Sequence, residues 1–91
     1  MNSKSQSNGC LAVQMEDARH CLTDLAKRGL VISSVEIGGR QEVPRIKIST
    51  TYLEPGGLRG ELRGTKHLNG KAVTIHALKH HNCQVEWEVS S

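Results

Sequence analysis

Only one stretch of this sequence has the period of an amphipathic helix, and every segment with the period of a β-strand follows it. Across residues 11–28, apolar side chains recur at spacings of four, three, four and three, which places them on one stripe of a 3.6-residue helix. The stripe consists of Leu11, Met15, Ala18, Leu22 and Leu25. Gly29 is expected to end the helix in the left-handed conformation, with Leu30 folding back onto the last turn.

Four later segments have the alternation or the β-branched composition of strands. They are residues 30–37, 43–49, 71–78 and 83–89. Gly38 and Gly39 are expected to form a tight hairpin turn between the first two segments, and Asn69-Gly70 is a turn signal before the third. Pro44 cannot donate a hydrogen bond to a ladder, which indicates a strand start or a sheet edge.

The alternation also predicts which side chains share a face of the sheet. In the second strand, Ile46 and Ile48 are expected to face one side. In the third strand, the expected apolar face consists of Val73, Ile75 and Ala77, opposite Thr74 and His76. The last strand alternates most clearly, with one face formed by Cys83, Val85, Trp87 and Val89. Tyr52 and Trp87 are the only aromatic residues, and the position of Trp87 on this apolar face predicts a place in the core.

Residues 50–64 fit neither pattern. Residues 54–57 (EPGG) predict a turn, and the two runs after it, GLRG and ELRG, repeat each other. Their glycines disfavour a helix, so the segment is expected to be either an irregular strand or a mobile basic loop. Residues 62–68 are a candidate for one further short strand.

These elements predict an α+β fold. One N-terminal helix would pack on the apolar face of a mostly antiparallel sheet of four strands, or of five if residues 62–68 also pair. The length of 91 residues fits one domain. We expect a disordered tail at residues 1–10, which are rich in Ser and Asn, and a single domain at residues 11–91.

The cysteines indicate a reducing compartment. Cys10, Cys21 and Cys83 are odd in number and irregularly spaced. Residues 1–9 lack the apolar region of a secretory signal, and no apolar run approaches the roughly 20 residues that span a bilayer. We therefore expect a cytoplasmic protein with reduced thiols and no membrane contact.

Histidines gather beside a cysteine near the end of the sequence. The candidate metal ligands are His76, His80, His81 and Cys83, with His67 across the Asn69-Gly70 turn. Imidazole and thiolate bind zinc well, but the spacing lacks the two ligand pairs of a structural zinc site, and His76 and Cys83 are expected on opposite faces of their strands. The favoured interpretation is solvated turn histidines beside a core cysteine, without metal or other cofactor. A metal site and a pH-responsive surface remain the alternatives.

Basic residues are frequent in the middle of the chain, and the net charge is +3. The candidate partner-binding residues are Arg40, Arg45, Lys47, Arg59, Arg63, Lys66 and Lys71. On one side of the fold they would form a cationic surface suited to phosphate. Against nucleic acid, stacking aromatics are lacking, and no helix-turn-helix, zinc-finger or RNP pattern occurs. An ordinary solvated face is the other interpretation.

The motifs do not predict an enzyme. Cys21 follows His20, but neighbours on a helix point in different directions and do not form a nucleophile–base pair. The paired glycines lack the spacing and the following Lys-Ser/Thr of a phosphate-binding loop.

Three runs of the sequence carry a resemblance to known proteins: residues 26–37 (AKRGLVISSVEI), 44–48 (PRIKI) and 82–87 (NCQVEW). The chain resembles short phage and prophage reading frames, in which a helix ending in Arg-Gly leads into a hairpin and the chain finishes on a Cys-x-Val-x-Trp strand. The resemblance implies an accessory protein that binds host machinery in the bacterial cytoplasm, as anti-CRISPR inhibitors of defence complexes do. Fold alone does not establish such a function.

Two functions are therefore expected. The first is a protein that binds and inhibits a host complex, with or without bound nucleic acid, through a sheet face or an edge strand, and as a monomer or a homodimer. Its basic balance excludes imitation of DNA by an acidic surface. The second is a small nucleic-acid-binding or regulatory module, whose affinity would fall steeply with salt.

Overall fold

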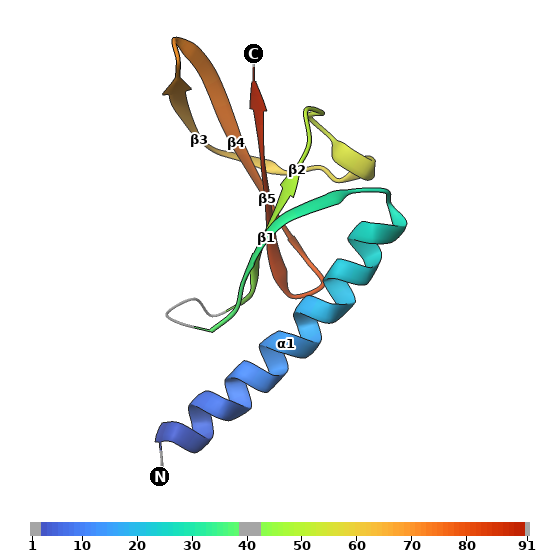
Figure 1. Ribbon diagram of the computed structural model, residues 1–91, viewed down its shortest axis with the longest axis vertical. Coiled ribbons are helices and arrows are strands. Elements are labelled where there is room, and N and C mark those ends of the chain that lie inside the picture. Colours follow the sequence, from blue (N-terminus) through green and yellow to red (C-terminus); the bar gives the residue numbers. More distant parts are fainter. Residues whose placement is uncertain (1–2, 39–42, 91) are drawn as a thin grey trace.

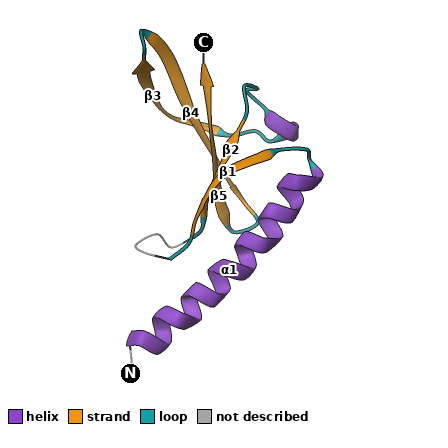
Figure 2. Cartoon of the chain, in the orientation of Figure 1, coloured by secondary structure: helices purple, strands orange, loops and turns teal. Residues whose placement is uncertain are grey.

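The computed structural model describes residues 3–38 and 43–90 and has the expected α+β fold. One helix lies on one side of a single sheet (Figures 1 and 2). The elements are α1 (Ser3–Lys27), β1 (Val31–Glu36), β2 (Arg45–Ser49), the 3-10 turn η1 (Pro55–Gly57), β3 (Glu61–Leu68), β4 (Lys71–His80) and β5 (Cys83–Ser90).

The sheet has five strands in the order β1-β2-β5-β4-β3. All neighbouring pairs are antiparallel except β2 and β5, which are parallel. The fifth strand is the candidate at residues 62–68, which forms β3 and pairs with β4 from Glu61 to Leu68. Pro44 stands just before β2, as predicted for a strand start; β2 itself lies inside the sheet rather than at its edge.

Two-residue turns fix the register of the two hairpins after η1. Asn69 and Gly70 both have positive φ, 52° and 79°, as a type I′ turn requires, and this prediction is confirmed. His81 and Asn82 form a second such turn, with φ of 49° and 61°. Gly38 has the predicted positive φ, whereas the other half of that expected glycine turn lies outside the described residues.

Helix α1 begins at Ser3 rather than at residue 11, because the polar residues before the apolar stripe can continue the backbone hydrogen bonds without a buried face. The end is as predicted: the Leu30 amide donates to the Leu25 carbonyl at 3.1 Å, and Gly29 is left-handed. Only the C-terminal half packs against the sheet, and the N-terminal half extends beyond it (Figure 1). Leu11 and Met15, expected in the buried stripe, are therefore 39% and 57% exposed.

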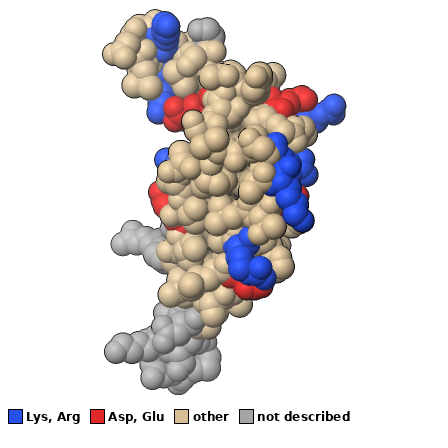
Figure 3. Space-filling model, turned by 45° about the vertical axis from the view of Figure 1, so that its right-hand side comes forward, with Lys and Arg blue, Asp and Glu red and all other residues tan. Residues whose placement is uncertain are grey.

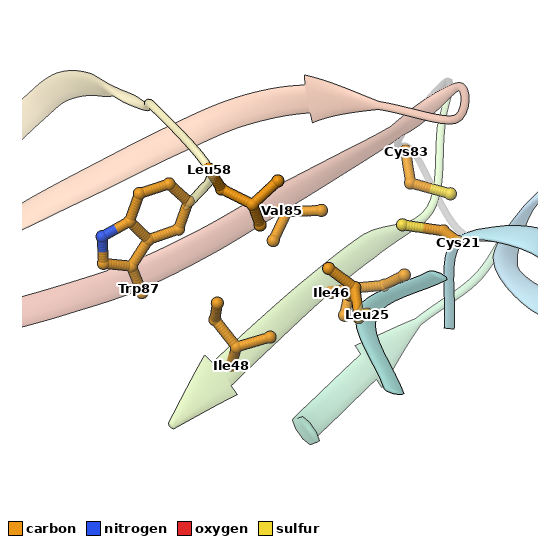
Figure 4. Close-up of a cluster of buried hydrophobic side chains, with 8 residues drawn as sticks. All are labelled: Cys21, Leu25, Ile46, Ile48, Leu58, Cys83, Val85 and Trp87. Carbon is orange, nitrogen blue, oxygen red and sulfur yellow. The ribbon is translucent and has the colours of Figure 1, made fainter. Parts of the chain in front are cut away.

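The core lies between the C-terminal half of α1 and one face of the sheet (Figure 4). Its buried members are Cys21, Leu25, Ile46, Ile48, Leu58, Cys83, Val85 and Trp87. Trp87 is 2% exposed, as predicted, and its indole Nε1 donates to the Leu53 carbonyl at 3.2 Å. The segment around η1, left open between strand and loop, is thus an ordered turn that covers Trp87 before the chain enters β3.

The faces of β4 are the reverse of the expectation. His80 pairs directly with Cys83, and His76 with Trp87, so the even-numbered side chains of β4 share the face that packs on α1. His76 and Cys83 therefore lie on the same face, not on opposite ones. The expected apolar set Val73, Ile75 and Ala77 faces away from α1, because the two-residue turn at His81 fixes this register.

Candidate functional site

The face of the sheet turned away from α1, here called the open face, contains a hollow. The hollow has a volume of about 580 Å³ and is lined by side chains from every strand. Its apolar floor comes from β3 and β4, and includes Leu68, Val73 and Ile75. Both edge strands carry an irregularity in register, in β1 after Ile32 and in β3 after Leu62. Such bulges increase the local twist of a sheet, which fits the hollowed shape of this face.

A bidentate ion pair stands on the open face at the parallel junction of β2 and β5. The Arg45 Nε and Nη2 atoms donate to the two carboxylate oxygens of Glu86 at 2.9 and 3.3 Å. The Gln84 amide donates to the same carboxylate at 3.0 Å, and Glu36 lies 3.8 Å from Arg45. Burial by itself raises the pKa of Glu86, but the bonds and charge of Arg45 outweigh it, so the pKa is lowered. The pair is therefore ionised at neutral pH.

A second ion pair reaches across β4. Lys66 of β3 lies 2.8 Å from Glu88 of β5, although β4 stands between these strands. The register places Lys66 beside Val73 and Glu88 beside Ile75, so this pair passes over the apolar floor. Both side chains are nearly half exposed, and an exposed pair of this kind contributes only about 0–1 kcal/mol.

The open face is therefore mixed in charge rather than cationic. Arg45, Lys47 and Lys66 are its cations in the hollow. Glu36 adjoins Arg45, and two further carboxylates line the hollow. Figure 3 shows the same pattern over the side it presents, where Lys and Arg form separate groups with acidic side chains beside several of them.

The six described residues of the predicted partner-binding set do not form one patch. Arg45, Lys47 and Lys66 line the hollow, while Lys71 stands at the far end of β4 next to the Asn69 turn. Arg59 follows η1 and pairs with Glu54 at 3.7 Å. Arg63 is the unpaired bulge residue of β3, and Arg40 lies outside the described residues. The basic residues separate because they occupy strands, a turn and a bulge, and because carboxylates lie between them.

The histidine group divides in two. His76 stacks on Trp87, with ring centroids 6.1 Å apart, and lies 2.9 Å from the Thr74 hydroxyl. His80 and His81 lie apart from this stack, beside Asp24 of α1. His80 Nε2 lies 2.6 Å from Asp24 Oδ2. His76 is thus a packed residue and does not belong with the other two.

Asp24 completes a cluster that the sequence did not reveal. The ligand atoms of Asp24, His80 and His81 all lie within 4.8 Å of one another. The bond from His80, and after it the bond from Arg28, lowers the pKa of Asp24 to about 2. The available signal was the position of Asp24, directly before Leu25 of the apolar stripe. Nothing in the sequence indicated that residues 56 apart would meet.

The two described cysteines are packed residues. Cys21 and Cys83 are buried and lie side by side between α1 and β5 (Figure 4). Burial, and after it the neighbouring Cys83, raises the pKa of Cys21 to about 12. His20 is directed to Glu16, at 3.1 Å, rather than to a thiol. Cys21 therefore remains a protonated thiol without a base, which is unreactive as a nucleophile.

Comparison with protein-family models, with curated proteins and with solved structures finds no match to this chain. Within residues 3–38 and 43–90, no helix has the length and apolar character needed to cross a membrane.

Proposed function

We propose that this chain is a non-enzymatic binding protein that uses the open face of its sheet to hold a protein partner. The observation that carries the proposal is the hollow on the face that α1 does not cover. It has an apolar floor and two ion pairs, so charged groups of both signs lie around it. Apolar floors framed by polar groups are typical of protein interfaces. Following the resemblance to phage accessory proteins, we propose that the partner is a complex of the bacterial host and that binding inhibits it in the cytoplasm.

The interleaved charges favour a protein partner over nucleic acid. A phosphate backbone approaching Arg45 or Lys66 would meet Glu86 or Glu88 within the same ion pairs. Those cations are already neutralised, so they would release few counterions from nucleic acid, which is the main source of such affinity. A protein segment can instead bury an apolar side chain on Val73 and Ile75 and exchange charges of both signs at the rim.

The alternative is a small nucleic-acid-binding module. Its support is the net charge of +3 and two cations of the β3–β4 hairpin, Arg63 at the bulge near the start of β3 and Lys71 beside the Asn69 turn. Within the described part of the chain, neither has an ion pair. In this alternative the hairpin, not the open face, would contact phosphate.

Affinity capture from bacterial lysate, with and without nuclease, tests the proposal when two matched variants are included. Lys47→Glu with Leu68→Asp changes one cation and one exposed leucine of the open face. Arg59→Glu with Leu53→Asp makes the same changes at exposed residues outside the hollow. Thermal unfolding establishes that both variants are folded.

We expect the wild type and the Arg59/Leu53 variant to capture the same discrete complex after nuclease treatment, and the Lys47/Leu68 variant to lose it. Equal capture by all three proteins would overturn the assignment to the open face. Loss of the complex on nuclease treatment, or recovery of nucleic acid alone, would favour the module that binds phosphate. Recovery of a second copy of this chain would indicate a homodimer instead.

A further inference from the structure

We propose that Asp24, His80 and His81 form a binding site for a divalent transition metal ion, with Zn²⁺ as the best fit. The site joins the last turns of α1 to the turn between β4 and β5. A carboxylate and two imidazoles are a ligand set that zinc accepts with tetrahedral geometry. This proposal does not depend on the proposed partner binding, because the cluster faces α1 and the hollow lies on the other face of the sheet.

The distances are close to those that zinc requires. Zinc bonds to nitrogen and oxygen of about 2.0–2.1 Å in a tetrahedron place the ligand atoms roughly 3.3 Å apart. His80 Nε2 lies 2.6 Å from Asp24 Oδ2, and His81 Nε2 lies 3.9 Å from Asp24 Oδ1. The ligand atoms of all three residues lie within 4.8 Å of one another, so side-chain movements of roughly 1–1.5 Å would bring them to the spacing of the metal site.

His81 distinguishes this cluster from a simple ion pair. The Asp24–His80 pair alone would tie α1 to the hairpin, and it would not need a second imidazole. His81 nevertheless stands with its ring 4.4 Å from that of His80, in an edge-to-face arrangement, and directs Nε2 toward the same carboxylate. It does so from a backbone position with φ of 49°, which Gly or Asn would occupy with less strain.

The site is open to solvent, so an ion can enter without unfolding. His81 is exposed, whereas His80 and Asp24 are half-buried. Three protein ligands leave the fourth tetrahedral position for water or for an added ligand, as in zinc sites that are not purely structural. The buried sulfur atoms of Cys21 and Cys83 face each other inside the core (Figure 4), and the proposal does not include them.

Arg28 opposes the metal and provides a useful variant. Its Nε donates to Asp24 Oδ2 at 2.7 Å, and its Nη1 donates to the Gly56 carbonyl at 2.8 Å. The guanidinium therefore competes with a metal ion for the same oxygen and adds a positive charge beside it. Replacement of Arg28 by Gln is expected to tighten metal binding, although it removes a contact of the fold.

Zn²⁺ titration of tag-free protein, stripped with chelator and followed by calorimetry and thermal unfolding, tests the site. We expect one equivalent of Zn²⁺ and a rise in Tm of roughly 10–20 °C when free zinc is 100 times its Kd. His81→Asn should weaken binding at least tenfold while keeping the turn and the Asp24–His80 pair. Arg28→Gln should strengthen binding.

His67→Asn is the matched control, because it removes an exposed histidine on β3, away from the cluster. It should leave the affinity unchanged. Binding of less than one equivalent, equal affinity in wild type and His81→Asn, or equal loss in His67→Asn would each overturn the proposal. Because His81→Asn retains the fold through a residue that favours positive φ, reduced binding cannot be assigned to unfolding when its far-UV circular dichroism matches the wild type.

Discussion

Gly60 lies against the indole ring of Trp87, and this contact predicts the effect of one added methyl group. A Cβ at position 60 would lie 2.6 Å from Cη2 of Trp87 and 3.1 Å from the Ala77 carbonyl oxygen. The buried ring donates to the Leu53 carbonyl, so it cannot retreat without breaking that bond or disturbing the core. We expect Gly60→Ala to lower the free energy of unfolding by about 1–3 kcal/mol, with roughly 4–8 °C in Tm for each kcal/mol.

Urea unfolding followed by tryptophan fluorescence measures this effect directly, since Trp87 is the only tryptophan. Gly64→Ala is the matched control within β3, because an added Cβ there would meet no described heavy atom within 4 Å apart from its own chain neighbours. It should leave stability unchanged or raise it by up to about 1 kcal/mol, as the unfolded chain loses freedom. A urea midpoint for Gly60→Ala equal to that of the wild type, or an equal loss of unfolding free energy in both variants, would refute the argument from the contact with Trp87.

Three further predictions concern charge and thiols. Glu86→Gln should lower the free energy of unfolding at pH 7 by about 1–2 kcal/mol, allowing for the partial exposure of Arg45. Because the pKa of Glu86 lies below its ordinary value of 4.5 in the folded state, its contribution is present above that pH and is lost as pH falls through the folded pKa. The acid-induced loss of stability should therefore be smaller in Glu86→Gln than in wild type. If the urea midpoints of the two proteins fell by the same amount as the pH was lowered, this prediction would be contradicted. Once the partner is known, a plot of the logarithm of the association constant against the logarithm of the salt concentration should have a slope of magnitude below about 2. A steeper slope would indicate phosphate contacts. Cys21 and Cys83 should resist a thiol reagent in native protein and react in urea, as peptide mapping by mass spectrometry would show; rapid native labelling of either would contradict their burial.

Local patterns predicted the elements well because their signals lie within a few residues. The Gly29 cap, the Asn69-Gly70 turn and the alternation of β5 each follow from short-range backbone and side-chain geometry. Alternation in β4 identified which side chains share a face, but not which face meets α1. Both sets of that strand contain apolar residues, such as Ile75 and Leu78, so hydrophobicity could not decide between them. The register of the His81 turn decided it instead.

The candidate sites were harder to predict because they depend on contacts distant in sequence. Asp24 meets His80 only when α1 folds across the β4–β5 turn. Likewise, the cationic surface was inferred from the number of basic residues, and that number could not show that Glu86 and Glu88 would lie between them. The partner, the inhibition and the phage-type origin remain predictions, since the fold itself does not specify them.

The two ion pairs of the open face have different consequences for a partner that binds there. One helix covers one face of this sheet, so Val73 and Ile75 on the other face are shielded mainly by charged side chains laid over them. Lys66 and Glu88 are nearly half exposed, and separating them forfeits at most about 1 kcal/mol. The Glu86 carboxylate is far less exposed and accepts hydrogen bonds from both Arg45 and Gln84. Breaking the Arg45–Glu86 ion pair would leave a buried charge unpaired. A partner can therefore displace the first pair to reach the apolar floor, while the second keeps the junction of β2 and β5 in place.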